Sequence, residues 1–347
     1  MKANFGHPLS GIRVVDLTSL LPGGIATRLL ADLGAEVVKV EPPGGESGRH
    51  FPPLDDGLSV YYRLTAGGKK VRILDLKTPK GRAALDVLLT KADVLIHSLR
   101  PGAVRRLSLS ASDVAARNPR LVQVRIAGFR RSGKAAHDAN FLAASGLLDL
   151  NRDTRGRPVI PRFQIPDVAG GAWPAVSAVL TGLLERERTG RATAATVSLQ
   201  EGSLALLSFG AAEYLATGRL ASDGALVTPE LHPCYGLYPT KDGRLLAVAC
   251  IESKFWVAFC KAVGLPELVP LQYASGATGR RARRCLAAAT RRRTFAEWNR
   301  RLESLDVCVT PVATLAEAVE AELRLEKGRG VFRRGRDGRY EIVPRIR

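Results

Sequence analysis

The first 130 residues switch between two hydrophobic periods, one typical of strands and one typical of helices. Residues 12–17 and 36–41 are runs of strand length that are rich in β-forming residues, and residues 25–33 between them are amphipathic with helical spacing. Gly34 stands where a helix C-terminus is expected. Such a β-α-β unit predicts parallel strands. Further strand-like runs occupy residues 71–76, 92–97 and 121–126, so the pattern favours an α/β fold with a doubly wound parallel sheet.

The segments that follow these strands are the places where an open α/β sheet binds its ligands. Residues 98–106 are predicted to form a loop with arginines that suit phosphate groups, although a solvated basic loop fits the same pattern. Residues 18–24 do not have the spacing G-x-G-x-x-G, so the dinucleotide-binding fingerprint is absent. Residues 78–91 predict the next helix, with a threonine cap and a proline at its first position.

Residues 128–135 nearly match the phosphate-binding pattern G-x-x-x-x-G-K-[ST]. Ala135 replaces the hydroxyl residue that would bind magnesium, so nucleotide hydrolysis is not expected. Arg130, Arg131 and Lys134 could still meet a phosphate group.

The second half begins with a long helical pattern over residues 168–187, which ends at Gly190. Loop composition at residues 217–229 suggests a linker, and a smaller α+β unit follows. Other predicted elements are a strand at 193–199, a helix at 201–215, a hairpin of strands 235–239 and 245–249, helices at 252–263, 295–302 and 315–321, and a basic, turn-rich end at 328–347.

Composition limits the classes of protein. The 347 residues contain no apolar run of eighteen residues, and residues 1–7 lack the apolar core of a signal peptide. The five cysteines show no C-x-x-C or zinc-site spacing. We therefore expect a cytoplasmic protein with free thiols, no membrane span and no bound metal.

The net charge of +19 would attract polyanions such as nucleic acid, acidic lipid or phosphorylated small molecules. The densest basic cluster, residues 279–284 and 291–293, has little aromatic content and no nucleic-acid motif. Most of this charge is therefore predicted to be solvated surface, and specific nucleic-acid binding is not expected.

Two short stretches carry candidate chemistry. One contains His137, and the other contains Asp167 before a predicted helix and the pair Gly170-Gly171. They offer a base, an acid and, through the glycines, a close approach of backbone N–H groups to an oxyanion. The structural alternatives are a helix-capping Asp and a packed or solvated His.

Five motifs together resemble the superfamily of family III CoA-transferases and α-methylacyl-CoA racemases. They lie at residues 8–16, 31–41, 74–81, 92–102 and 118–121, and the resemblance extends from Pro8 to about Phe332. It implies a Rossmann-like large domain and a smaller α+β domain, with two chains interlocked as an obligate homodimer. The implied division is a large CoA-binding domain in residues 1–200, a linker in 201–228, a small domain in 229–305 and a return to the large domain in 306–347.

The resemblance also implies the chemistry of an acyl-CoA substrate, with no cofactor other than the coenzyme A of that substrate. Transferases of this superfamily use one Asp as a nucleophile, whereas racemases use a His and an Asp on opposite faces of the thioester α-carbon. Asp167 matches the shared Asp, His137 matches the racemase His, and Glu252 matches a Glu that orients it. We therefore favour a 2-methylacyl-CoA racemase, with a CoA-transferase as the alternative.

Coenzyme A contacts are expected where the family places them. The matching residues are Leu74, Lys77, Leu99, Ala103 and Arg106, and Arg131 is added as a cation in the region that resembles a phosphate-binding loop. The chain departs from the family pattern at Pro42, at residues 68–71 and at His97-Ser98, where Glu-Asn is usual. A basic protein that binds coenzyme A or nucleic acid without turnover is the remaining alternative.

Overall fold

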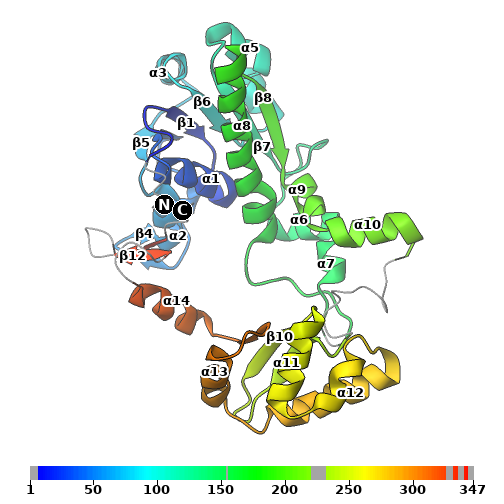
Figure 1. The fold of residues 1–347 in the computed structure, drawn as a ribbon. Helices are drawn as coiled ribbons and strands as arrows, with labels where there is room; N and C mark the ends of the chain where they lie inside the picture. Colours follow the sequence, from blue (N-terminus) through cyan, green and yellow to red (C-terminus); the bar gives the residue numbers. More distant parts are fainter. Residues whose placement is uncertain (1–6, 154, 220–231, 326–330, 335–339, 343–347) are drawn as a thin grey trace. The chain divides into compact units, whose positions relative to one another are not determined.

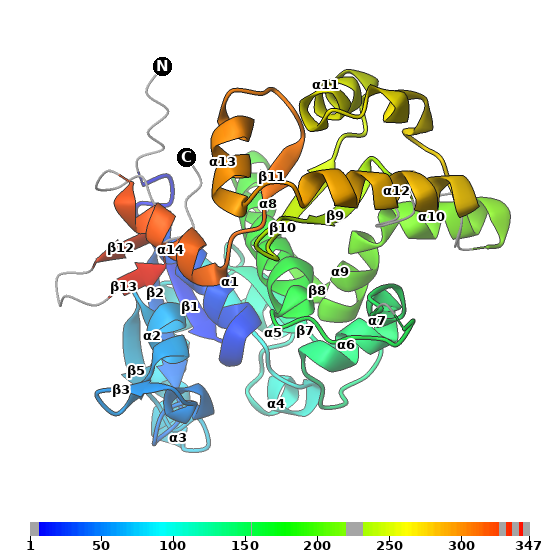
Figure 2. The ribbon, with the colours of Figure 1, turned by 90° about the horizontal axis from the view of Figure 1, so that it is seen from below.

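The computed structural model describes residues 7–153, 155–219, 232–325, 331–334 and 340–342. Two compact units are present, one comprising Met1–Ser208 with Leu325–Arg347 and the other comprising Phe209–Arg324. Figures 1 and 2 show the elements of each unit in two views. Residues 220–228 of the predicted linker lie outside the described residues.

The first unit is built on a six-stranded parallel sheet. Its order is β5-β2-β1-β6-β7-β8, so the chain adds strands first on one side of β1 and then on the other. The strands are β1 (Arg13–Leu17), β2 (Glu36–Glu41), β5 (Lys70–Ile73), β6 (Val94–His97), β7 (Val122–Ala127) and β8 (Ala194–Ser198). The predicted α/β fold with a doubly wound parallel sheet is confirmed.

Helices cover both faces of this sheet. On one face, α1 (Leu20–Asp32) and α8 (Trp173–Thr189) pack on Val14, Val94 and Val124. On the other, α3 (Pro79–Thr90) and α5 (Ala111–Arg117) pack around Val15 and Leu95. This alternation follows from the two-residue period of a strand, which sends neighbouring side chains to opposite faces.

The smaller elements of the first unit connect or flank this sheet. They are η1 (Ser47–His50), β3 (Leu54–Asp55), β4 (Leu58–Ser59), α2 (Val60–Ala66), α4 (Pro101–Arg106), α6 (Asp138–Ser145), α7 (Leu147–Leu150), η2 (Pro166–Ala172), α9 (Leu199–Leu206), β12 (Phe332–Arg334) and β13 (Tyr340–Ile342). β12 and β13 pair antiparallel, so the end of the chain that was predicted to be turn-rich also contains two short strands.

Several predicted boundaries differ from the observed ones. α1 begins at Leu20 rather than residue 25, because Pro22 in the first turn costs no helical hydrogen bond. The predicted basic loop at 98–106 contains α4, which has Pro101 in its first turn and two arginines in its last. The strand predicted at 71–76 ends at Ile73, where the pairing with β2 stops. Leu207 separates α9 from α10 (Ser208–Thr217), where one helix was predicted.

The helix predicted from residue 168 begins earlier and in another form. η2 is a π-helical turn that runs directly into α8. Together Pro166–Thr189 are long and apolar enough to cross a membrane by length and composition. This is weak evidence for a membrane span, because Ala172, Ala175 and Val179 of this segment are fully buried against the sheet, as in a core helix.

The second unit has a three-stranded antiparallel sheet of order β11-β10-β9. β9 (Tyr235–Pro239) and β10 (Leu245–Ala249) form the predicted hairpin, and β11 is Val309–Pro311. The remaining elements are α11 (Ser253–Val263), η3 (Pro266–Leu271), α12 (Gly276–Thr290), α13 (Phe295–Glu303) and α14 (Leu315–Arg324). Trp256, Phe259 and Trp298 are fully buried in its core.

Candidate active site

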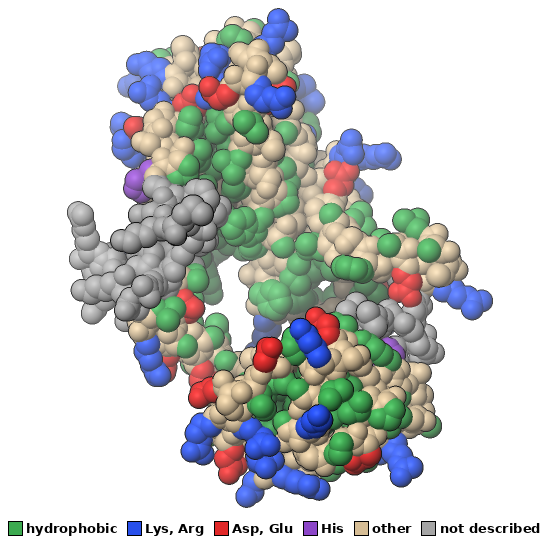
Figure 3. Space-filling view, viewed as in Figure 1, with side chains coloured by type: hydrophobic (Ala, Val, Ile, Leu, Met, Phe, Trp, Pro, Cys, Tyr) green, Lys and Arg blue, Asp and Glu red, His purple; other side chains and the backbone are tan. Residues whose placement is uncertain are grey.

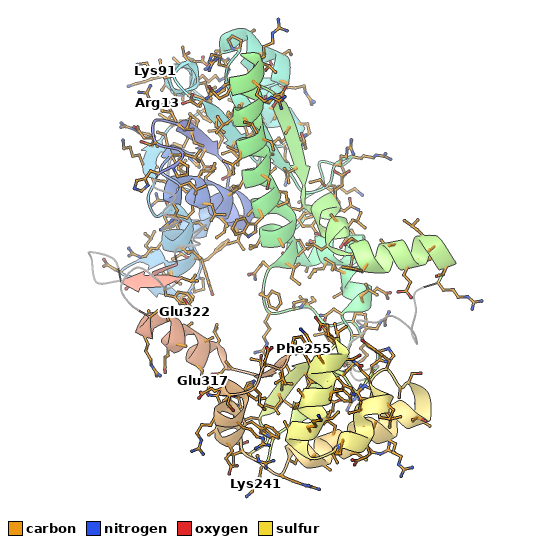
Figure 4. The ribbon with its side chains drawn as sticks, in the orientation of Figure 1. Arg13, Lys91, Lys241, Phe255, Glu317 and Glu322 are labelled. Atoms are coloured by element: carbon orange, nitrogen blue, oxygen red, sulfur yellow. The ribbon has the colours of Figure 1, made fainter. Side chains whose placement is uncertain are left out.

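The two ends of the parallel sheet differ in character. Arg13 and Lys91 mark the amino-terminal end, and the N–H of Arg13 donates to Asp93 Oδ2 over 2.9 Å (Figure 4). The carboxyl-terminal end carries a cavity of about 700 Å³, lined by the segments that follow β1, β2, β5 and β6. β1 and β6 are adjacent strands at which the strand order reverses, and this reversal is where doubly wound sheets bind ligands.

The residues predicted to contact coenzyme A converge on this cavity. Its lining includes Leu74, Lys77, Leu99, Ala103 and Arg106. Arg131 is not among the residues that line it and lies exposed in the loop between β7 and α6. The cavity therefore combines apolar side chains with two of the predicted cations.

Two buried glutamates also line this cavity, but their charges are compensated. Glu41 Oε2 accepts from Arg49 over 2.7 Å, and Glu41 Oε1 accepts from the hydroxyl of Tyr62 over 2.6 Å. Glu46 lies 3.0 Å from the ammonium of Lys39. Their negative charge is thus balanced by neighbouring cations, so these glutamates would repel an anionic ligand only weakly.

A second, smaller cavity of about 280 Å³ adjoins the first, since both are lined by Ser19, Ser98, Leu99 and Arg100. His137 and Asp167 both line the smaller cavity. The structure therefore brings the two predicted reactive residues, thirty positions apart in sequence, to one site next to the predicted coenzyme A contacts.

Asp167 sits within η2, one residue after Pro166, and so is not the helix-capping residue. Its N–H donates to Oδ1 of Asp138, the first residue of α6, over 3.0 Å. Burial and, secondarily, the charge of Asp138 raise the pKa of Asp167 to about 7. Burial also raises the pKa of Asp138, against the effect of that hydrogen bond. A carboxyl group with a pKa near 7 can donate or accept a proton at neutral pH.

His137 precedes α6 and is exposed on the surface of this cavity. Its N–H donates to Oδ1 of Asn140 over 2.9 Å, and this backbone bond fixes the start of the helix. His137 and Asp138 are consecutive, so the chain segment that presents the imidazole also supplies the neighbour of Asp167.

The glycine pair after Asp167 has a different role from the predicted one. Gly170 and Gly171 are buried and do not line the cavity. They allow η2 to approach α9, since a Cβ on Gly170 would lie 3.0 Å from Oγ of Ser203 and a Cβ on Gly171 would lie 3.2 Å from Cγ of Leu199. On the facing helix, a Cβ on Gly202 would lie 1.9 Å from the carbonyl oxygen of Gly170. The oxyanion cradle predicted at these glycines is therefore wrong, because their backbone faces a helix and not the cavity.

Replacement of Gly202 by Ala tests this close packing. The added methyl group would meet backbone atoms, which cannot rotate away, so we expect a loss of about 1–3 kcal/mol in the free energy of unfolding. Urea unfolding measures it. Gly102→Ala is the matched control, because its nearest neighbour would be Arg106 Nη1 at 3.5 Å. Equal stability of the two variants would contradict the close contact of η2 and α9.

The raised pKa of Asp167 predicts a pH-dependent stability. Folded Asp167 holds its proton up to about pH 7, whereas the unfolded carboxyl group loses it near its ordinary value of 3.8. Stability should therefore fall between about pH 4 and pH 7, by about 2–4 kcal/mol, as the unfolded state is favoured by ionisation. In urea unfolding, the wild type should be less stable at pH 8 than at pH 5, and Asp167→Asn should not show this difference in stability. An unchanged difference in Asp167→Asn would contradict the assignment of this pH dependence to Asp167.

Glu252 belongs to the second unit, where it is the N-cap residue of α11 and is exposed. Its predicted role beside His137 stays a prediction. Sequence reasoning missed Asp138 as the neighbour of Asp167 and Arg125 as a lining residue of the smaller cavity. Only the adjacency of Asp138 to His137 could have indicated the first, and no sequence signal indicates the second.

Leu20 at the edge of the smaller cavity has a left-handed backbone, with φ of 62°. A branched side chain rarely adopts this conformation, so the packing around it must hold it in place. It follows Ser19, which lines both cavities.

Comparison with known proteins decides the family. The family described as CoA-transferase family III matches residues 9–344. The chain belongs to this family. It is 33% identical over 329 residues to the human alpha-methylacyl-CoA racemase, covering 92% of this chain and 81% of the racemase. It is 34% identical over 268 residues to the mouse succinyl-CoA:glutarate CoA-transferase, covering 76% of this chain and 61% of the transferase.

A solved structure shows the same fold in a family III relative. Rv3272 of Mycobacterium tuberculosis superimposes with a TM-score of 0.83 at 27% identity, over 99% of this chain and 93% of that one. The predicted superfamily is therefore confirmed, as is the prediction of an enzyme that is either an acyl-CoA racemase or a CoA-transferase. Racemase and transferase relatives are similarly identical to the chain, so identity does not choose between the two reactions.

Proposed function

We propose that this family III enzyme is a racemase of 2-methylacyl-CoA thioesters that works by 1,1-proton transfer. The observation that carries the proposal is that His137 and Asp167 line one small cavity, next to the larger cavity lined by the predicted coenzyme A contacts. A transferase nucleophile needs only the aspartate, in its ionised form. The pKa of about 7 for Asp167 instead favours a group that exchanges protons.

In this mechanism a base removes the α-proton on one face, and an acid returns a proton on the other. Neutral His137 takes the proton of one epimer, and the C–H electron pair forms an enolate of the thioester. Protonated Asp167 then gives its proton to the same carbon, which leaves an imidazolium and a carboxylate. For the other epimer the carboxylate removes the proton and the imidazolium supplies it, so each reaction restores the starting state of the opposite one.

The enolate oxygen carries negative charge that the cavity must stabilise. Three cationic residues line this cavity, Arg100, Arg125 and Lys134. Positive groups placed in advance where charge develops can lower a barrier by about 3–4 kcal/mol for each well-placed donor. We assign that stabilisation to these cations in place of the buried glycines.

The larger cavity suits the coenzyme A moiety of the substrate. Its volume of about 700 Å³ is that of a small-molecule site. Lys77 and Arg106 supply positive charge for phosphate groups, and Leu74, Leu99 and Ala103 supply apolar surface. The proposal needs no resident cofactor, because coenzyme A arrives as part of the substrate.

A CoA-transferase is the second candidate, because the cations of the smaller cavity also suit a carboxylic acid acceptor. Arg100, Arg125 and Lys134 would also attract the carboxylate of an acceptor acid. Ionised Asp167 would attack the thioester carbon, coenzyme A would leave as the thiolate, and the acyl group would remain on Asp167 as a mixed anhydride. The thiolate would then attack the Asp167 carbonyl of this anhydride, which releases the donor acid and leaves coenzyme A as a thioester on Asp167. The acceptor carboxylate would displace the thiolate from Asp167 to form a second anhydride, and the thiolate would take the acceptor acyl group from it, which restores the Asp167 carboxylate. No step would need His137.

The variant His137→Ala separates these two reactions. In a racemase it should lower epimerisation by about 10²-fold or more, because one of the two proton-transfer groups is lost. In a transferase it should leave transfer of CoA to an added acid nearly unchanged. His50→Ala, an exposed histidine outside the smaller cavity, is the matched control. Full epimerase activity in His137→Ala would overturn the racemase proposal.

We also propose that the enzyme is a homodimer. The helix α10 contains no buried residue, and Phe209 and Leu215 are each 83% exposed. Hydrophobic side chains on α10 are visible at the surface in Figure 3. An apolar helix face of this kind is typical of a protein interface. Light scattering should therefore give about twice the chain mass of 37.3 kDa. A monomeric mass at micromolar concentration would contradict it.

A further inference from the structure

A basic groove on the second unit has no part in the proposed reaction. It lies where α12 packs beside β9, and its volume is about 460 Å³ (Figure 2). The described residues that line it are Leu237, Tyr238, Arg280, Arg283, Arg284 and Ala287. None of these is acidic, and residues 268–296 of the chain contain no Asp or Glu. The groove therefore has a positive potential that attracts anionic partners.

The arginines belong to the solvent-facing side of α12. The opposite side of this helix is buried in the core of the second unit through Ala282, Leu286 and Ala289. Arg280 and Arg284 are exposed and one helical turn apart, so their side chains start about 5–6 Å from each other. Two guanidinium groups at this spacing can each donate to a separate carboxylate of one partner.

β9 presents backbone groups along the same groove. It is the last strand of the sheet β11-β10-β9 in the described part of the chain. The N–H of Thr240 donates to the carbonyl oxygen of Arg244 over 2.7 Å, and the N–H of Cys250 donates to that of Cys234 over 2.9 Å. Hydrogen-bonded pairs occupy every second position of an antiparallel ladder, so the N–H and C=O of Leu237 point away from β10, toward the edge of the sheet.

We propose that this groove binds an acidic segment of another protein in an extended conformation, which adds a strand to β9. The backbone of the segment pairs with the N–H and C=O of Leu237, and its carboxylates pair with Arg280 and Arg284. Alternate residues of a strand are about 6–7 Å apart on one face, close to the spacing of these two arginines. The site goes beyond the proposed racemase reaction, since none of its lining residues lines the larger or the smaller cavity.

Two features favour a polypeptide over other polyanions. The aromatic residue of the groove is Tyr238, which is 2% exposed and donates its hydroxyl to the carbonyl oxygen of Pro233 over 2.6 Å. Its ring is therefore closed to the base stacking by which single-stranded nucleic acids bind. A phosphodiester accepts hydrogen bonds but donates none, so it cannot pair with the C=O of Leu237, whereas a peptide strand supplies both a donor and an acceptor.

Fluorescence anisotropy of a labelled peptide of alternating glutamate and valine residues tests the proposal on the full chain in low-salt buffer. The peptide should bind once per chain, and its analogue with lysine in place of glutamate should not bind. Arg280→Gln combined with Arg284→Gln should weaken binding by about tenfold, because two charge-assisted contacts are lost. Arg291→Gln combined with Arg292→Gln is the matched control. It removes the same charge from exposed arginines outside the groove and should change binding by less than about twofold.

Methylation of the peptide amides separates strand addition from attraction by charge alone. Successive N–H groups of a strand point to opposite edges, so the glutamate amides lie on one edge and the valine amides on the other. Methylation of one set should abolish binding, and methylation of the other set should be tolerated. Equal binding of the two methylated peptides, or equal weakening by the two arginine pairs, would overturn the proposal. Tighter binding of single-stranded DNA or of phosphatidylserine vesicles through Arg280 and Arg284 would assign the groove to that ligand and overturn it as well.

Hydrogen exchange at the Leu237 amide gives an independent readout. Its nuclear magnetic resonance signal, assigned in leucine-labelled protein by its loss in Leu237→Ile, should exchange rapidly in D₂O and be slowed by saturating peptide. An exchange rate that does not respond to the peptide would contradict the assigned strand pairing. Epimerisation should be the same in the wild type and in both arginine variants, so the docking proposal can fail while the racemase proposal stands, and the reverse also holds.

Discussion

Asp167→Asn is expected to abolish both the racemase and the transferase reaction. Asparagine keeps the shape of the side chain but can neither exchange a proton nor form an acyl anhydride. We expect the turnover number to fall by about 10³-fold or more, the size of effect seen when a proton-transfer group or nucleophile is removed. Turnover of the thioester, followed by chiral separation of the product acids, measures it.

The matched control is Asp86→Asn, a carboxylate on α3 that pairs with Arg117 and lies outside the two cavities. It should retain wild-type turnover. Binding of coenzyme A should survive in Asp167→Asn, since Asp167 does not line the larger cavity. Retention of activity by Asp167→Asn would exclude this residue from the chemistry.

Asp16→Ala is expected to have the largest effect on stability. Asp16 is fully buried at the end of β1, where its carboxylate accepts from the N–H and hydroxyl of Thr18 and from the hydroxyl of Thr27. Lys69 lies 3.3 Å away and is itself buried. Burial alone would raise the pKa of Asp16, but the charges of Lys69 and Lys39 outweigh it and lower that pKa.

Removal of Asp16 would leave the buried ammonium group of Lys69 without its counter-charge, whereas Lys39 would keep Glu46 as a partner. We expect a loss of about 3–5 kcal/mol in the free energy of unfolding, as when one partner of a buried ion pair is removed. Urea unfolding of the two single variants, Asp16→Ala and Lys69→Met, and of the double variant measures the coupling between these residues. The double variant should be more stable than the sum of the single changes. Additive losses would contradict a direct interaction.

This ionic cluster borders the larger cavity, because Thr18 lines that cavity while its hydroxyl and N–H donate to Asp16. The sequence pattern did not indicate the ion pair of Asp16 and Lys69, since residues 68–71 were noted only as a departure from the family motif. Lys69 reaches Asp16 across 53 positions of sequence, and a pattern of local periodicity contains no information about such a pair.

The fold was largely predictable, because β-rich segments such as residues 12–17 and 36–41 are separated by a clear helical period. The elements that were missed share a physical cause. Residues 18–24 and 98–106 were predicted to be loops, although Pro22 and Pro101 lie in the first turn of α1 and α4, where a proline is compatible with a helix. In η2 the π-helical form results from tertiary packing on α9, which no local propensity encodes.

The site was predictable only in part. His137 and Asp167 were recognisable from their motifs, and the structure brings them to one cavity. The raised pKa of Asp167 depends on burial and on Asp138, both of which require the folded chain. The role of the glycine pair was not predictable, since flexibility for a ligand and space for a neighbouring helix leave the same sequence pattern.

Proton magnetic resonance of one epimer of a 2-methylacyl-CoA, incubated with the enzyme in D₂O, tests the central claim most directly. The racemase proposal predicts loss of the α-proton signal together with formation of the other epimer, at a rate that is independent of any added carboxylic acid. An unchanged α-proton signal, with a new CoA ester only when an acid is added, would contradict it and establish CoA transfer.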